Sequence, residues 1–105
     1  MENKKALRLT LKKDAFDVMI TGEKMLEFRK PSDWIMSRLF FNANPAQGMK
    51  PYDKVIFTNG YGKRRPSFER KYDGCIRVTE TREYAYSNGL VVKAEKGDII
   101  IRLKM

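Results

Sequence analysis

The chain has 105 residues, 42% of them hydrophobic, which is typical of one folded domain spanning residues 1–105 and excludes a disordered protein. It contains one Cys and no His, which excludes an internal disulfide and every His-based catalytic scheme. A zinc site built from the usual ligands is nearly excluded as well. We therefore expect no metal and no cofactor. The 22 Lys and Arg residues outnumber the 13 Asp and Glu residues, and the net charge of +9 favours a polyanionic partner, nucleic acid above all.

The first part of the chain predicts a strand followed by a helix. "ALRLTLKK", residues 6–13, has a Leu at every second position, which is the alternation of a half-buried strand. Apolar side chains at i, i+3 and i+4 in the next segment, "DAFDVMITG", predict a helix. We expect Asp14 to cap this helix and Gly22 to end it.

A second strand is predicted directly after this helix, in "KMLEFRK", residues 24–30. Because side chains alternate between the two faces of a strand, Leu26 and Phe28 share one face and Glu27 and Arg29 share the other. We expect the apolar pair to enter the core.

The rest of the chain predicts one more helix and several short strands. Ser32 or Asp33 can cap a helix in "PSDWIMSRLFF", and Asn, Pro and Gly predict a loop over residues 42–53. The segment 60–71 is expected to be a second long loop or an irregular hairpin. Strands are expected in four further places: residues 54–59, one or two within 72–86, a short one within 87–97, and 98–104.

This succession of elements indicates an α+β fold. Both helices fall in the first half of the chain, so the regular alternation of a doubly wound parallel sheet is absent. We therefore predict a small, mostly antiparallel sheet that curls into a β-barrel with about two flanking helices.

The octapeptide "GEKMLEFR" resembles the Gly-x-Lys-x-x-Glu-x-Arg signature of the ASCH domain family, whose members are PUA-like small β-barrels. Gly22, Lys24, Glu27 and Arg29 match it, and "LRLTLKKDAFDVMITGEK", "KPYDKVIF" and "GCIRVTET" resemble the flanking parts of that fold at lower specificity. The resemblance implies binding of RNA or nucleotides. Some members resemble an amidohydrolase that deacylates N4-acetylcytidine, and a few resemble ribonucleases.

The amidohydrolase activity is associated with the signature Lys, a Thr three residues later and a distant Glu. Here Lys24 is present but Glu27 occupies the place of that Thr, which weakens the hydrolase interpretation. Physically, a Glu beside two cations stays ionised and can accept hydrogen bonds from the exocyclic amine of a base. Arg29 can form a forked contact with a phosphate or a carbonyl edge. The alternative is an exposed salt bridge worth about 0–1 kcal/mol.

A second candidate region is the basic–aromatic segment "YGKRRPSFERK", residues 61–71, in which rings alternate with cations. Aromatic rings can stack bases while Lys and Arg hold phosphates, a combination suited to single-stranded nucleic acid. The predicted binding residues are Tyr61, Lys63, Arg64, Arg65, Phe68, Arg70 and Lys71. The alternative is a solvated loop whose aromatics only anchor it. Trp34, the single Trp, can either stack a base or pack its helix.

Together these features predict a nucleic-acid-binding module, with RNA favoured, that uses a charged cleft around Lys24, Glu27 and Arg29. The alternative is a small metal-independent enzyme, a nucleoside amidohydrolase or a ribonuclease, in which Lys24 and Glu27 are catalytic. A protein-interaction module with an acidic partner is a third possibility. No apolar run approaches the roughly 20 residues of a membrane span, and the lone Cys fits a reducing compartment, so we expect a cytoplasmic protein without a membrane partner.

Overall fold

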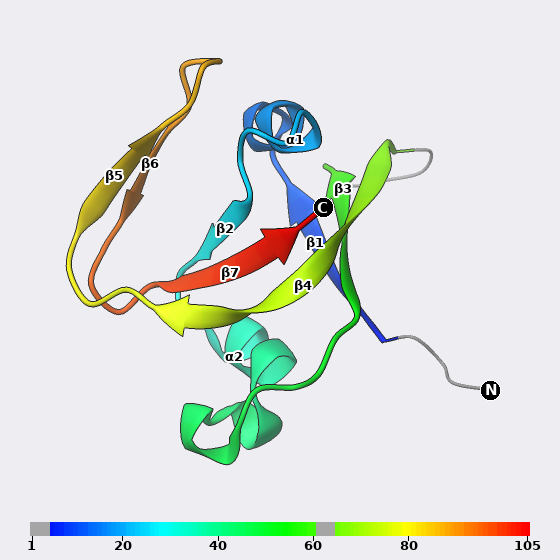
Figure 1. The fold of residues 1–105 in the computed structure, drawn as a ribbon. Coiled ribbons are helices and arrows are strands. Elements are labelled where there is room, and N and C mark those ends of the chain that lie inside the picture. The colour runs from blue at the N-terminus through cyan, green and yellow to red at the C-terminus, as the bar shows by residue number, and fades with distance from the viewer. Residues whose placement is uncertain (1–4, 61–64) are drawn as a thin grey trace.

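The computed structural model describes residues 5–60 and 65–105 (Figure 1). The helices and strands are, in chain order, β1 (Ala6–Leu11), α1 (Lys13–Ile20), β2 (Leu26–Arg29), α2 (Asp33–Leu39), β3 (Lys54–Asn59), β4 (Ser67–Arg77), β5 (Arg82–Ala85), β6 (Val91–Ala94) and β7 (Ile99–Lys104). Two 3-10 turns follow α2: Phe41–Ala43, which begins one residue before the predicted 42–53 loop, and Pro45–Gln47, which lies within it. Among the described residues, no helix has the length and hydrophobicity needed to cross a membrane.

Five strands form one mixed sheet in the order β1-β3-β4-β7-β2, and β5 pairs with β6 in a separate hairpin. Only β1 and β3 are parallel; the other pairings are antiparallel. This confirms the predicted α+β class and the mostly antiparallel sheet. Figure 1 shows α1 and α2 at opposite ends of the curled sheet, with the hairpin set apart from it.

The predicted barrel does not close through its backbone. β1 and β2 are the two edge strands of the sheet, and no strand pairing joins them in the part of the chain that the structure describes. A side chain spans the gap instead, since Arg29 of β2 donates a hydrogen bond to the carbonyl oxygen of Thr10 in β1. The seam between these edges is therefore a place where side chains replace backbone pairing.

The main core lies between the inner face of the sheet and the two helices. Its buried members include every second residue of β1 and of β7, as the alternation predicted, together with Phe16 and Met19 of α1. A smaller cluster of Val78, Ala94 and Ile100 lies beside the β5–β6 hairpin.

The expectation that Leu26 and Phe28 enter the core requires a correction. Both are only partly buried and pack against the smaller cluster, next to the hairpin. The opposite face of β2 points inward, where Glu27 is 6% exposed and Lys24, just before the strand, is 1% exposed. The two faces are exchanged because the hairpin supplies a second apolar surface that covers Leu26 and Phe28.

The turn before this strand follows the prediction in part. Gly22 adopts a φ of 90°, which favours glycine, and its N–H bonds to the Met19 carbonyl as α1 ends. Asp14 is not the N-cap. The helix begins at Lys13, and Lys12 occupies the capping position, two residues before the predicted cap.

Residues 60–71 were predicted to form either a long loop or an irregular hairpin, and the second half of this segment supports the hairpin. β4 begins at Ser67 and pairs with β3, so Phe68, Arg70 and Lys71 lie on a strand. Their alternation of half-buried and exposed side chains has the period of a strand, but the run of charged residues obscured it. Residues 61–64, which include Tyr61, Lys63 and Arg64, lie outside the described residues.

Ser32 caps α2, since its side-chain oxygen accepts a hydrogen bond from the Ile35 N–H at 3.2 Å. We predict that Ser32→Ala lowers the free energy of unfolding by about 1 kcal/mol, because a donor in the first turn of the helix loses its partner. Urea denaturation measures this loss. Ser32→Asp, which restores an acceptor, is the control and should recover most of the stability; equal losses in both variants would contradict the capping role.

Candidate functional site

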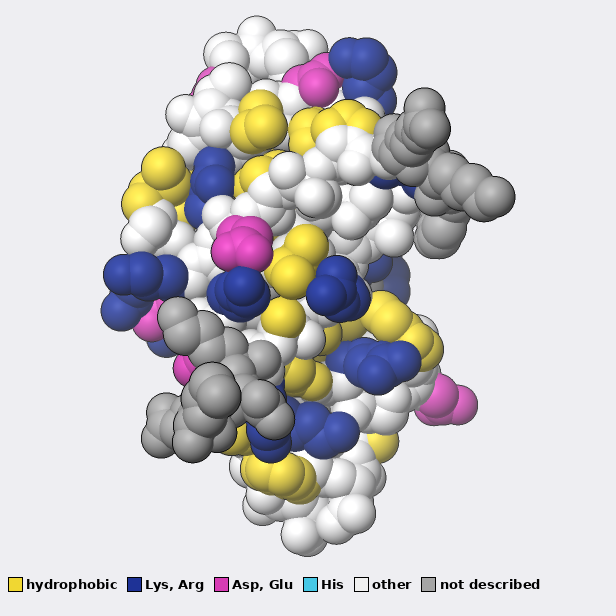
Figure 2. Space-filling model, turned by 90° about the vertical axis from the view of Figure 1, so that its right-hand side faces the viewer, with side chains coloured by type: hydrophobic (Ala, Val, Ile, Leu, Met, Phe, Trp, Pro, Cys, Tyr) yellow, Lys and Arg dark blue, Asp and Glu magenta, His cyan; other side chains and the backbone are white. Residues whose placement is uncertain are grey.

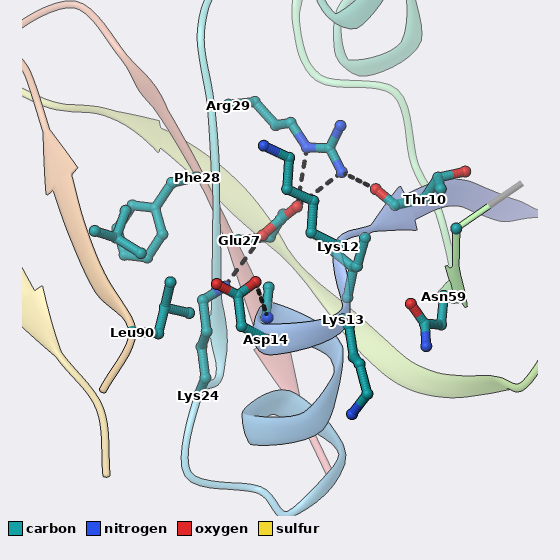
Figure 3. Close-up of a pocket in the computed structure, with 14 residues that line it drawn as sticks. Thr10, Lys12, Lys13, Asp14, Lys24, Glu27, Phe28, Arg29, Asn59 and Leu90 are labelled. Carbon is teal, nitrogen blue, oxygen red and sulfur yellow. Dashed lines mark hydrogen bonds and ion pairs between the residues drawn. The ribbon is translucent and has the colours of Figure 1, made fainter. Parts of the chain in front are cut away.

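A cavity of about 850 Å³ opens at the seam between the two edge strands (Figure 3). Four parts of the chain line it: the end of β1 with the start of α1, the β2 region, the end of β3, and the β5–β6 hairpin. The lining residues are Thr10, Leu11, Lys12, Lys13, Asp14, Ala15, Lys24, Glu27, Phe28, Arg29, Asn59, Gly60, Leu90 and Val92. The three charged signature residues, Lys24, Glu27 and Arg29, all line this one cavity.

Lys24 and Glu27 form a buried ion pair at the wall of this cavity. The Lys24 ammonium lies 3.1 Å from Glu27 Oε1 and donates a second hydrogen bond to the Leu26 carbonyl oxygen at 2.5 Å. The turn at Gly22 places Lys24 shortly before β2, where its ammonium can reach Glu27. The pair is not the exposed salt bridge that the sequence left open as an alternative.

Arg29 completes the network and joins the two sheet edges. Its Nε lies 3.0 Å and its Nη2 2.8 Å from Glu27 Oε2, so the guanidinium meets one carboxylate oxygen with two nitrogens. The same Nη2 donates to the Thr10 carbonyl oxygen at 2.9 Å. We call Lys24, Glu27 and Arg29 the ion network; its outer member, Arg29, is 26% exposed and faces the cavity.

The environment of Lys24 weakens its hold on a proton. Burial is the largest influence and lowers the pKa of Lys24 below its ordinary value, and the nearby Arg29 acts in the same direction. The charge and hydrogen bond of Glu27 oppose this but do not cancel it. The ammonium also lies 5.2 Å from the centre of the Phe28 ring and 6.0 Å from that of Tyr86, which partly offsets the lost hydration. Lysines with a lowered pKa occur at functional sites as well as in structural networks.

The walls of the cavity differ in character. Phe28, Leu90 and Val92 form an apolar side, and Figure 3 shows Lys12, Lys13 and Asn59 on the opposite, polar side. Lys13 is paired with Asp17, whereas Lys12 is exposed and makes no ion pair with a described residue. The cavity therefore offers an apolar surface facing a cation and an amide.

The hairpin that supplies the apolar side is fixed at its tip. Glu23 accepts hydrogen bonds from the backbone N–H and the hydroxyl of Ser87, at 2.7 and 2.5 Å. The Asn88 side chain donates to the Asp14 carbonyl at 2.9 Å. These contacts hold Leu90 opposite the start of α1 and so set the width of the cavity.

The basic–aromatic segment contributes less to this site than predicted. Phe68 packs against Phe16 and Phe57, with ring centres 5.0 and 5.4 Å apart. Arg70 lies over Phe68 and donates at 3.1 Å to the carbonyls of Met19 and Ile20 at the end of α1. Both side chains therefore serve the packing of α1.

The remaining residues of the segment differ in position. Arg65 lies beside Gly60, which lines the cavity, but is itself not among the lining residues. Lys71 is exposed on β4 and does not line the cavity either.

Several lining residues escaped sequence reasoning. Lys12, Asn59, Leu90 and Val92 come from segments far apart in the chain, and no local pattern links them. Trp34 does not line this cavity. Within residues 5–60 and 65–105, no group of three or more Cys, Asp or Glu side chains forms a set suited to a metal ion.

Comparison of the chain with protein-family models, with curated proteins and with solved structures found no match.

The burial of the ion network predicts a large effect of removing its single anion. Glu27→Gln should lower the free energy of unfolding by about 3–5 kcal/mol, because Lys24 and Arg29 remain close together without a counter-charge. Denaturant unfolding measures the loss. Glu80→Gln, in the exposed Arg82–Glu80 pair, is the matched control and should cost at most about 1 kcal/mol. Equal small losses would show that the network is solvated.

Proposed function

We propose that the cavity binds one nucleotide of a single-stranded nucleic acid, with RNA favoured. The observation that carries this proposal is the arrangement of an apolar wall opposite cations in a cavity of about 850 Å³, beside a buried carboxylate held by two cations. A nucleotide has the matching parts: a flat base with polar edges and an anionic phosphate.

The apolar wall suits the base. Phe28, Leu90 and Val92 can cover its face, in the way that aromatic and aliphatic side chains hold unstacked bases in RNA-binding proteins. The Glu27 carboxylate accepts hydrogen bonds from Lys24 and Arg29 and retains acceptor capacity for the exocyclic amine of cytosine or adenine. Asn59, on the opposite side, adds an amide that can donate and accept.

The cations suit the phosphate. Lys12 stands at the cavity without an ion-pair partner among the described residues, and Arg29 Nη1 makes no hydrogen bond to them. Both can donate to phosphate oxygens, and the net charge of +9 attracts a polyanion over a longer range. Figure 2 shows one face of the molecule on which Lys and Arg side chains are more widespread than the acidic side chains among them.

The resemblance to the ASCH domain family supports the same function. Gly22, Lys24, Glu27 and Arg29 are the residues that carry it, and each takes part in building the seam: the glycine turns the chain and the other three form the ion network. In this proposal the sheet is a PUA-like barrel whose closure between β1 and β2 depends on side chains.

Binding of an eight-nucleotide single-stranded RNA, measured by fluorescence anisotropy over a series of salt concentrations, tests the proposal. We predict that Lys12→Ala weakens binding and makes the slope of log K against log salt shallower by about 0.7, the value for one phosphate contact. Lys96→Ala removes an exposed lysine outside the cavity. It is the control and should leave the salt slope unchanged, because it removes no phosphate contact. Absence of binding at low salt, or equal effects of both variants, would refute the proposal.

A second candidate function is hydrolysis of an N4-acylated cytidine at the same cavity. The observation that favours it is the desolvated Lys24, whose pKa is lowered, beside the carboxylate of Glu27. Among the described residues that line the cavity, only Thr10 carries a hydroxyl, so either this hydroxyl or water would attack the acyl carbonyl. Addition of water across the amide bond would release the carboxylate and cytidine.

Incubation with N4-acetylcytidine, followed by chromatography of cytidine, tests this activity. If the enzyme interpretation is correct, Lys24→Met should reduce turnover at least about 100-fold, in keeping with the loss of an acid–base group. Lys96→Ala serves as the control and should retain full turnover. No cytidine release by the unaltered protein, or turnover that survives both Lys24→Met and Glu27→Gln, would remove the enzyme from consideration.

A further inference from the structure

A second, smaller hollow lies at the other end of β1, where this strand meets α2. Its volume is about 250 Å³, and it is lined by Ala6, Leu7, Arg8, Trp34, Arg38 and Tyr52. We call it the Trp34 groove. It shares no lining residue with the larger cavity.

Of the two aromatic residues that line this groove, Trp34 is unusually accessible to solvent. Trp34 is 48% exposed although it is the only Trp of the chain, and tryptophan is highly buried on average. The Arg38 guanidinium, one helical turn later, lies 5.3 Å from the centre of its ring. This contact orders the indole while leaving nearly half of the side chain accessible.

The charged side chains among the described residues that line the groove are both cations. Arg8 and Arg38 are both exposed, and neither makes an ion pair with a described residue. None of the described residues that line the groove is acidic. Tyr52 is fixed at the other side by a hydrogen bond from its hydroxyl to the Arg38 carbonyl oxygen. An accessible ring in one groove with two guanidinium groups that form no ion pair with a described residue matches a ligand that carries both a flat π-system and negative charge.

We propose that the Trp34 groove is a second binding site for single-stranded nucleic acid, in which a base stacks on Trp34 and the adjoining phosphates contact Arg8 and Arg38. Stacking on an aromatic side chain is worth about 1–3 kcal/mol per base and does not depend on base identity. An acidic polypeptide would satisfy the arginines but would leave the exposed face of the indole without a planar partner, which is why nucleic acid fits better.

The groove and the cavity lie along the same strand, β1, so a single nucleic acid could occupy both. This link between the two sites rests on the proposed function of the cavity. Every second position along this part of the chain contributes a polar side chain: Arg8, Thr10 and Lys12. Arg8 lines the groove, and the other two line the cavity. Neighbours of this kind lie about 7 Å apart along a strand. One nucleic acid strand that follows β1 can therefore place one nucleotide in the cavity and another on Trp34.

The single Trp makes the groove directly observable. Titration with an eight-nucleotide single-stranded RNA should quench the Trp34 emission in parallel with the anisotropy change of the labelled RNA. Trp34→Ala should weaken binding at least about five-fold, the equivalent of 1 kcal/mol. Arg8→Ala and Arg38→Ala should each make the salt slope shallower by about 0.7, whereas Arg77→Ala, an exposed arginine on β4, should not.

The outcomes separate this site from the cavity. Quenching that needs Arg8 but is indifferent to Lys12→Ala supports the groove and removes the nucleotide cavity. Binding that needs Lys12 while Trp34 emission stays constant, with no effect of Trp34→Ala, overturns the groove and leaves the cavity in place. Polyglutamate that quenches Trp34 as strongly as RNA would also overturn the groove, since charge alone would then explain it. Absence of RNA binding overturns both.

Discussion

The structure depends on a charged contact placed where a barrel of hydrogen-bonded strands would close. β1 and β2 end the sheet on its two sides, and the side chain of Arg29 joins them by reaching the Thr10 carbonyl while it also grips Glu27. Lys24 supports the same carboxylate from the buried side. Because side chains are longer than backbone groups, this form of closure holds the edges apart and leaves room for the cavity. The buried charges are therefore the reason that a concave site exists at this seam.

Burying such a network costs desolvation free energy, which contacts to the charged groups offset. Desolvation of charged groups is unfavourable unless hydrogen bonds replace water, and here Lys24 finds a carbonyl, a carboxylate and two aromatic rings. An apolar seam of the same size would close more simply. We infer that the polar arrangement serves the proposed ligand site, because it presents an ordered carboxylate and a partly exposed guanidinium, as preorganised sites require.

The sequence predicted the elements with clear periodicity and the residues of the ion network, but not their surroundings. The leucines of β1 and the isoleucines of β7 were placed correctly, because alternation determines which face of a strand is buried. The orientation of β2 was wrong, since the hairpin that covers Phe28 lies more than fifty residues later in the chain. For the same reason Leu90 and Lys12 were missed: their roles arise from tertiary proximity alone. The start of strand β4, residues 67–71, was obscured by its charged residues, which on an outer face are compatible with a strand.

The state of Lys24 tests the central claim most directly. Two-dimensional NMR of the lysine side chains across a pH titration, with the Lys24 signal assigned from its loss in Lys24→Met, reports both the pKa and the exchange of the ammonium protons. A buried Lys24 that is hydrogen-bonded to Glu27 and Leu26 should titrate below 10.5 and exchange its protons more slowly than exposed lysines. A Lys24 that titrates at 10.5 or above, with rapidly exchanging protons, would show that its side chain lies in solvent and that the seam is not closed by buried charges.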